Sequence, residues 1–211
     1  MRFGLFGMLM LLGATSASAE TPFERQVLVA LNAARANPAA FAAGLKRYRT
    51  YFHANLVRYP GLNADIETQE GVKVVDETIG FLDHQAGLAP LAGSSLFATT
   101  AADLVADQAR GGTGHESSDG ATPSDRARRH GGGELVAEVI AYGSVDPADV
   151  IRQLIVDDGV ADRGHRAIIF SPELRFAGVA CGPHPEYRTM CVIDLGVTPD
   201  GRYPVRTLRS R

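Results

Sequence analysis

The sequence of residues 175–196, RFAGVACGPHPEYRTMCVIDLG, predicts a β-hairpin near the end of the chain. Its two ends are rich in apolar, strand-forming residues, and the stretch between them is centred near Glu186. A hairpin with this centre places Cys181 directly opposite Cys191 in an antiparallel pair. A disulfide between them would close a loop of about ten residues and stabilise the fold by roughly 2 to 3 kcal/mol. Two buried free thiols are the alternative.

The region before the hairpin, residues 94–159, predicts helices around one strand. An apolar stripe that starts after Ser94 and stops at two glycines indicates a helix, and a second, short helix is expected over residues 123–130. Residues 134–142, ELVAEVIAY, have the alternation and branched side chains of a strand. Asp146 then caps a helix, and Gly159 fits the left-handed position at its end.

The N-terminal part of the predicted mature chain is helical. Thr21-Pro22-Phe23-Glu24 is a capping box with proline at the first helical position, and Asn37 precedes a second proline that begins another helix. Residues 59–72 lack periodicity and predict a loop before a short helix over 75–85. Because strands and helices do not alternate regularly, we predict an α+β fold with helices packed over a small antiparallel sheet.

Two histidines and several carboxylates stand in unusual local settings. His115 and His165 each follow a glycine just after a predicted helix, and Glu138 lies among apolar residues of the predicted strand, where an unpaired carboxylate is costly. At about 100° per residue, Asp158 projects near the middle of the helix's apolar stripe and Asp157 near its edge. Two imidazoles and two carboxylates would form a divalent-metal site or a self-satisfied hydrogen-bonded cluster.

The order of these motifs resembles that of the CAP superfamily, which comprises cysteine-rich secretory proteins, antigen 5 proteins and pathogenesis-related proteins, with bacterial SCP-like relatives. The motifs are LN-xx-R at residues 31–35, GHESSDG at 114–120, AEVIAYG at 137–143, IVDDGVADRGHR at 155–166, and the two halves of the hairpin. The resemblance implies a three-layer α-β-α sandwich with a central cleft.

In the family, this cleft is lined by two histidines and two acidic residues that hold a divalent cation in several members. The resemblance carries these positions to His115, Glu138 and His165. The family's Trp-x-x-Glu is replaced by Leu154-x-x-Asp157, so its spacing favours Asp157, whereas the helical projection favours Asp158. The alternative of Asp157 or Asp158 stays open at this stage.

Nitrogen and oxygen ligands without a thiolate suit zinc, manganese or magnesium, and we expect no organic cofactor. The resemblance implies a binding or interaction module that takes a small hydrophobic ligand or an extracellular protein. The alternative is a metal-assisted, peptidase-like hydrolase with Glu138 or an aspartate as general base. A third interpretation is that the cluster merely links the helices to the sheet. The pairs Asp125-Arg126 and Asp162-Arg163 are interpreted as structural salt bridges or solvated charges.

Residues 1–19 have the basic start, short apolar run and Ala17-Ser18-Ala19 site of a signal peptide. We therefore predict export to the periplasm or the extracellular space, a CAP/SCP-like domain over residues 20–197 and a polar tail over 198–211. The formal net charge of −3 does not favour a nucleic-acid partner, and no stretch is long enough to predict a membrane span.

Overall fold

The computed structural model describes residues 20–59 and 65–204. The predicted signal peptide and residues 205–211 lie outside the described residues. The helices are α1 (Pro22–Ala36), α2 (Pro38–Tyr48), α3 (Val72–His84), α4 (Ser95–Gln108), α5 (Pro123–Arg129), α6 (Pro147–Val156) and α7 (Gly164–Ile169), with a 3-10 turn, η1 (Arg49–Tyr51). The strands are β1 (Phe52–His53), β2 (Leu56–Val57), β3 (Ile66–Glu67), β4 (Ala92–Gly93), β5 (Ala137–Tyr142), β6 (Phe176–His184) and β7 (Arg188–Gly196).

The main sheet has the strand order β4-β6-β7-β5. The predicted hairpin is confirmed, because β6 and β7 pair antiparallel with Cys181 opposite Cys191, and the two cysteines form a disulfide. Strand β5 pairs antiparallel with β7 and is the outer strand on that side, whereas the short β4 pairs parallel with β6. The sheet is therefore mixed at one edge rather than wholly antiparallel. Strands β1, β2 and β3 form a separate small sheet.

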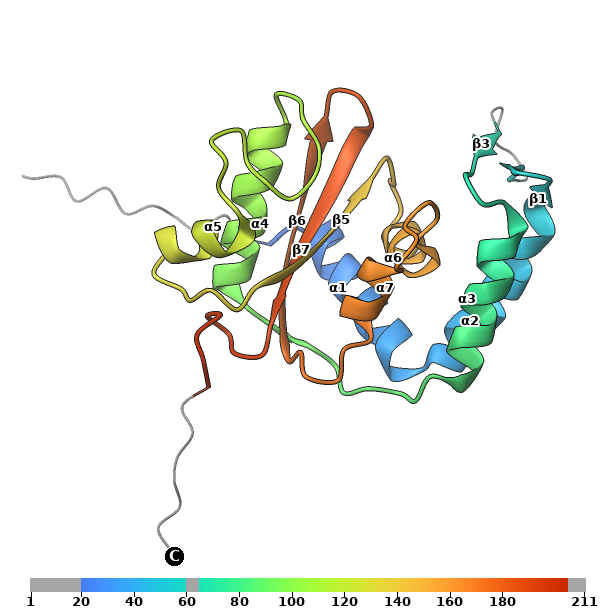
Figure 1. Cartoon of the computed structure of the whole chain (residues 1–211), viewed down its shortest axis with the longest axis horizontal. Helices are drawn as coiled ribbons and strands as arrows, with labels where there is room; N and C mark the ends of the chain where they lie inside the picture. The colour runs from blue at the N-terminus through green and yellow to red at the C-terminus, as the bar shows by residue number, and fades with distance from the viewer. Residues whose placement is uncertain (1–19, 60–64, 205–211) are drawn as a thin grey trace, which may run out of the picture.

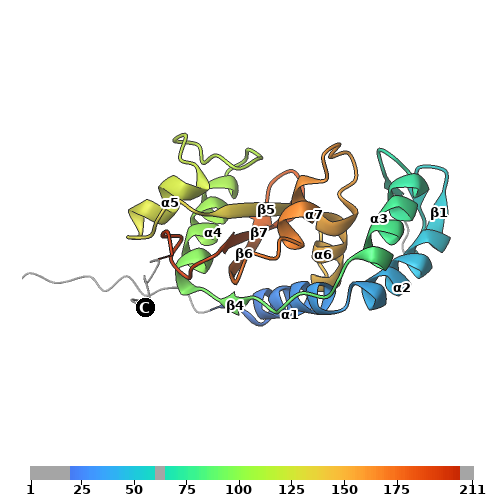
Figure 2. The same cartoon turned by 60° about the horizontal axis from the view of Figure 1, so that its bottom comes forward.

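Helices cover both faces of the main sheet, which gives the expected α+β fold with three layers (Figures 1 and 2). Helix α4 packs on β6 and β7 from one side, with α5 beside it, while α1, α6 and α7 pack on the other side. Gly178 of β6 makes the close packing of α4 possible, because a Cβ atom there would lie 2.0 Å from a backbone nitrogen of that helix.

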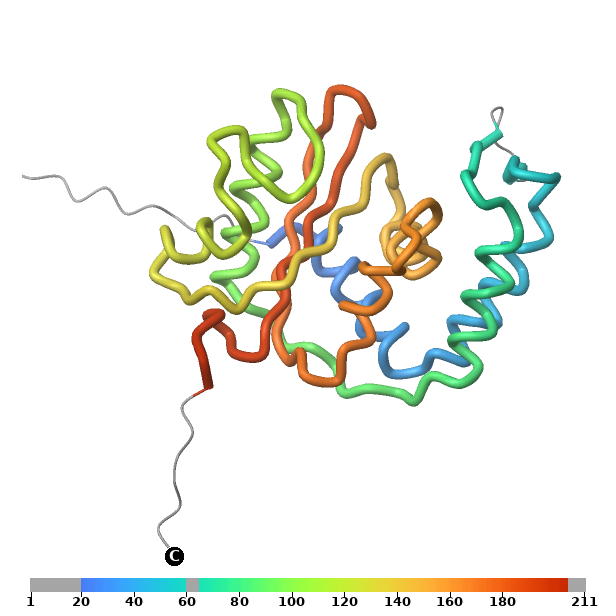
Figure 3. The backbone as a smooth tube through the Cα atoms, in the orientation of Figure 1, coloured from blue at the N-terminus to red at the C-terminus, as the bar shows by residue number. Residues whose placement is uncertain are grey.

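The larger apolar core lies on the α1 and α6 side of the sheet. It joins α1, α2, α3 and α6 to inward-facing residues of the strands, among them Val139 and Ile193. A smaller core under α4 includes Ile140 and Val192. Figure 3 shows the N-terminal helix lying against the C-terminal hairpin, and Glu24 of that helix accepts a hydrogen bond from the Cys181 backbone N–H at 2.9 Å.

Some helix boundaries in the structure agree with those predicted from the sequence, and others differ. The capping box at Thr21 and the helix starts at Asn37 and Asp146 are confirmed, and Ser94 caps the helix that was predicted to start after it. Helix α6, however, ends at Val156 and not at Gly159, α3 starts three residues earlier than predicted, and α7 was not predicted. In the predicted polar tail, Pro199 and residues 200–202 hydrogen bond with Ser94 and with residues 131–135. No helix of the described residues is long and apolar enough to cross a membrane.

Candidate functional site

Glu138, in the outer strand β5, forms the first half of the site. Its side chain is 1% exposed and shares the α4 side of the sheet with Ile140. One carboxylate oxygen, Oε1, accepts a hydrogen bond from Nδ1 of His115 at 2.8 Å. The other, Oε2, accepts one from Arg126. Both oxygens of this buried carboxylate are thus engaged.

Arg126 is a residue of the site that the sequence analysis assigned to an ordinary local salt bridge. It comes from α5, is 1% exposed, and reaches Glu138 rather than its neighbour Asp125, which pairs with Arg128. The guanidinium also donates to the backbone oxygen of His115 at 3.0 Å and so fixes the loop that carries this histidine. The available signal was a basic residue in a short predicted helix, but the sequence gives no way to choose its partner.

Asp157 and His165 form the second half of the site, at the end of α6 and the start of α7. Asp157 adopts the left-handed conformation, with φ 59°, and its side chain is 1% exposed. Its Oδ1 accepts from Nδ1 of His165 at 2.6 Å, and its Oδ2 accepts from the backbone N–H groups of His165 and Arg166 at 3.0 and 3.3 Å. The carboxylate therefore caps α7 and orients the imidazole at once.

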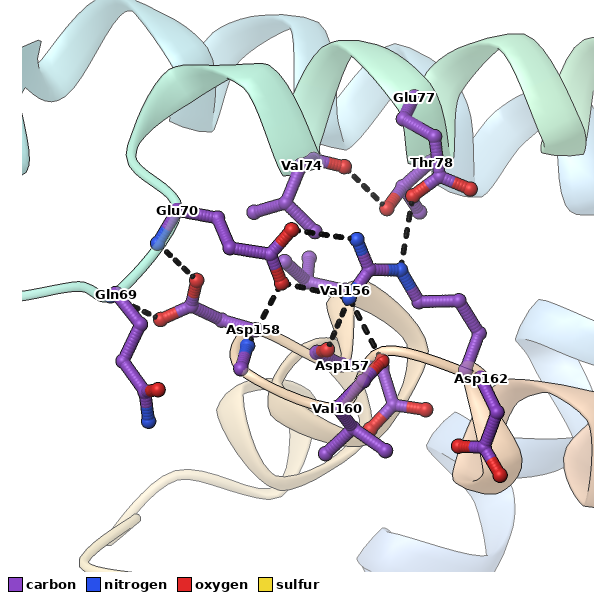
Figure 4. A network of polar contacts seen from close by, with 12 residues as sticks. Gln69, Glu70, Val74, Glu77, Thr78, Val156, Asp157, Asp158, Val160 and Asp162 are labelled. Atoms are coloured by element: carbon purple, nitrogen blue, oxygen red, sulfur yellow. Dashed lines mark hydrogen bonds and ion pairs between the residues drawn. The ribbon is translucent and has the colours of Figure 1, made fainter.

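Asp158 lies elsewhere, so the helical projection that favoured it was wrong. Its carboxylate accepts from the backbone N–H groups of Gln69 and Glu70, at 2.7 and 2.8 Å, just before α3 (Figure 4). The projection fails because α6 ends at Val156, and a residue beyond the end of a helix does not follow its 100° spacing. Asp157, the residue that the family spacing favoured, is the one that bonds to His165.

The two histidines meet from opposite sides of the sheet. His115 follows α4 and bonds to the α4-facing Glu138, whereas His165 belongs to α7, which packs against β5 on the α6 side. Their ring centroids are 6.3 Å apart. Of the five predicted site residues, the structure therefore brings together two carboxylate–imidazole pairs, His115–Glu138 and His165–Asp157, and leaves Asp158 outside.

Each imidazole uses its Nδ1 on a carboxylate, which directs the Nε2 edge elsewhere. The His115 side chain is 50% exposed and that of His165 22%, so solvent reaches both rings although both carboxylates are buried. Within the described part of the chain, no group of three or more His, Cys, Asp or Glu side chains is placed to hold a metal ion. The arrangement can offer the Nε2 atoms of two oriented imidazole rings to a ligand.

Asp194 is a buried acid beside this site that the sequence did not single out. It is directly opposite Glu138 in the β5–β7 register, is fully buried and accepts from the Thr100 hydroxyl. Burial raises the pKa of Asp194 well above its usual value, and the negative charge of Glu138 raises it further. Asp194 therefore holds its proton to higher pH than an exposed aspartate does, and Arg126 is the cation that pairs with Glu138.

The loop before His115 is fixed by polar groups of two other elements. The Gly114 N–H donates to the Tyr142 hydroxyl at 3.0 Å, and the Gln108 amide donates to the Gly114 carbonyl at 2.7 Å. Burial raises the pKa of Tyr142, so its hydroxyl stays protonated at neutral pH. Gln108, which interrupts the apolar stripe of α4, thus has a defined role in holding the histidine loop.

An open hollow of about 440 Å³ lies against α5, where Asp119, Asp125, Arg128 and Arg129 line it. These side chains form the ion pairs Asp119–Arg129 and Asp125–Arg128 across its wall. Its charged lining does not suit the small hydrophobic ligand that the family resemblance implies.

The sequence profile of the cysteine-rich secretory protein family, CAP, matches residues 29–195. The match covers both carboxylate–imidazole pairs and both cysteines. Comparisons with curated proteins and with solved structures gave no match.

Proposed function

Because this chain belongs to the cysteine-rich secretory protein family, we propose that it is an exported domain that binds a divalent cation between His115 and His165. The Cys181–Cys191 disulfide fits a protein that folds in an oxidising compartment, either the periplasm or the extracellular space. Export and cleavage after Ala19 complete the proposal, with residues 1–19 as the signal peptide.

The two buried carboxylates carry the argument for a metal. Metal-binding histidines usually donate their second ring N–H to a carboxylate, which fixes the tautomer and makes the other nitrogen a better ligand. Both histidines here have this arrangement, at 2.8 and 2.6 Å. Two imidazoles that share one tetrahedral ion through nitrogens at about 2.0 to 2.1 Å have ring centroids roughly 5 Å apart. The observed centroid distance is 6.3 Å, so the two rings would have to approach each other by about 1 Å to bind one ion in this geometry.

The ligand set decides which ion fits and how tightly. Two imidazoles favour zinc over magnesium, which prefers oxygen ligands, and manganese lies between them. Both carboxylate oxygens of Glu138 and of Asp157 already accept hydrogen bonds from other groups. We therefore propose that the protein supplies two metal ligands, the two imidazoles, and not four. We therefore propose a weaker site than a structural zinc site, with coordination positions left for water or for a donor group on a ligand.

This ligand set favours the binding module over the hydrolase. In the hydrolase alternative Glu138 or an aspartate acts as general base, but Arg126 and His115 engage Glu138, and His165 and the backbone engage Asp157. Binding needs no free carboxylate. The small hydrophobic ligand or extracellular protein partner stays a prediction from the family.

Zinc titration of the EDTA-treated chain from Glu20 to Arg211 tests this function. We expect one zinc ion per chain by calorimetry, and loss of binding in the double variant His115→Ala with His165→Ala. His130→Ala is the matched control, because His130 also bonds to a carboxylate, through Nε2 to Asp103 at 2.6 Å, and is not one of the two site histidines. Zinc binding that survives the double variant, or that is lost in the control, would overturn the proposal. A large loss of stability in the double variant without any zinc binding by the parent would favour the structural interpretation.

A further inference from the structure

Two arginines hold the segment that positions Asp157. Arg166 donates to the backbone oxygens of Ile155 and Val156, at 2.7 and 3.0 Å, and Arg163 donates to that of Asp157 at 3.0 Å. These carbonyls belong to the C-terminal end of α6, where helix carbonyls lack partners within the helix and the helix dipole favours a cation. The arginines thus fix the backbone on either side of the carboxylate that orients His165.

Both arginines are in turn paired with one acid on α3. Glu77 accepts from Arg166 through Oε1 at 2.6 Å and through Oε2 at 3.2 Å, and from Arg163 through Oε2 at 3.1 Å. Figure 4 shows Glu77 on α3 and Glu70 in the turn before this helix, near the segment that carries Asp157. Glu70 makes a two-oxygen pair with Arg163, whereas Glu77 is the one acid of the described residues whose side chain hydrogen bonds to both arginines.

We propose that Glu77 is a positioning residue for His165: by pairing with Arg163 and Arg166 together, it holds the end of α6 so that Asp157 keeps the imidazole in one orientation. Glu77 does not contact either histidine ring. The Arg166 side chain is 3% exposed, so without Glu77 its charge would have carbonyl and hydroxyl partners but no anion. Relaxation of Arg166 toward solvent would then release the carbonyls before Asp157.

Helix α3 offers a matched control for this proposal. Asp76, the residue next to Glu77, forms an ion pair with Arg49 and has a side-chain exposure of 46%, against 47% for Glu77. Asp76→Asn therefore removes an equally exposed charge from the same helix turn without touching the arginines at the end of α6. An effect that Asp76→Asn and Glu77→Gln share would come from the loss of a charge on α3, and not from the loss of the pairs with Arg163 and Arg166.

The test measures solvent exchange of the His165 Nδ1 proton by NMR in EDTA-treated, ¹⁵N-labelled protein. We expect Glu77→Gln to accelerate this exchange by about tenfold or more, the scale expected for losing a charged hydrogen-bond partner, and Asp76→Asn to leave it unchanged. Glu77→Asp keeps the charge and should restore slow exchange in part; if Glu77→Gln fails to fold, Glu77→Asp alone is compared with the control. Unchanged exchange in the Glu77 variants, or equal acceleration in Asp76→Asn, would overturn the proposal.

A second measurement connects Glu77 to the proposed function, on which the metal part of this inference rests. If the parent binds zinc, Glu77→Gln should weaken binding by about tenfold, as other changes behind a metal ligand do. Zinc binding that is equal in parent and Glu77→Gln would count against the positioning role. If the parent binds no zinc, the proposed function fails, whereas faster proton exchange in Glu77→Gln would still support the positioning role.

Discussion

Replacement of Arg126 by methionine tests the assignment of this residue as the counter-ion of Glu138. Both side chains are 1% exposed, and Arg126 also donates to the backbone oxygens of His115 and Ala121, at 3.0 and 3.1 Å. Removing one partner of a buried pair costs about 3 to 5 kcal/mol, because the other charge is left without compensation. For a chain of this size, 1 kcal/mol corresponds to about 2 to 4 °C, so we expect Arg126→Met to lower the melting temperature by roughly 6 to 20 °C.

The second variant, Arg126→Met with Glu138→Met, separates the ion pair from simple loss of packing. In the parent, Nε of Arg126 has no hydrogen-bond partner among the described residues, so burial of the guanidinium is incompletely compensated. Replacing both charges with apolar side chains should therefore recover a large part of the loss.

The control for these variants is Arg128→Met. Its ion pair with Asp125 is half exposed, and we expect it to cost about 0 to 1 kcal/mol. Urea and thermal unfolding at pH 7, with EDTA present and the disulfide intact, measure all three variants. The assignment is refuted if Arg126→Met costs no more than Arg128→Met, or if the double variant is no more stable than Arg126→Met.

The remaining predictions concern pH, packing and the disulfide. Because the pKa of Asp194 is raised, the folded chain keeps a proton that the unfolded chain releases above about pH 4, and parent stability falls as pH rises from there. The free energy of unfolding of Asp194→Asn, relative to that of the parent, should thus rise between pH 4.5 and 7 by at most about 1.4 kcal/mol per pH unit. If urea unfolding gives the same difference in free energy at every pH in this range, the prediction is contradicted. Gly178→Ala should lower the free energy of unfolding by about 3 kcal/mol or more, because the added Cβ clashes with α4. Gly44→Ala in α2, where an added Cβ meets nothing within 4 Å, should raise it by about 0.5 to 1 kcal/mol. Similar melting temperatures of the two variants would contradict the packing argument. Cys181→Ser with Cys191→Ser should lower the free energy of unfolding by about 2 to 3 kcal/mol, and no change would mean that the closed loop contributes nothing.

The elements that the sequence predicted well are those whose signals are local. Thr21 and Glu24 form a capping box from residues three apart, and the structure has both hydrogen bonds. The hairpin register follows from the strand period of two and the position of the turn, so the pairing of Cys181 with Cys191 could be predicted from the sequence alone. In these cases the partner of each group lies within a few residues or across one turn.

The errors arise where the partner lies on another element. Gly159 has a positive φ, as expected for the end of a helix, yet α6 stops earlier because Asp157 already adopts the left-handed conformation, with φ 59°. No short-range pattern indicates that the next residue, Asp158, bonds to the backbone before α3, 88 and 89 positions away along the chain. The partner of Arg126 was missed for the same reason, since an Asp–Arg neighbour in sequence suggested a local pair.

The two carboxylate–imidazole pairs also show why the order of the family motifs pointed to these residues, whereas the local helix and strand periodicity did not. Glu138 of the sheet strand β5 holds His115 on the α4 side, whereas Asp157 and His165 both belong to the layer on the α6 side. The distance between the rings therefore depends on how both layers pack against the outer strand β5, and no local signal encodes that packing. A cation held by both rings would link the two layers and stabilise the folded chain by RT ln(1 + c/Kd), where c is the cation concentration, so the stabilisation would grow with the logarithm of c above the dissociation constant. Changes that shift either layer, including those at Glu77 or Arg126, should consequently alter cation binding even though neither residue touches the ion.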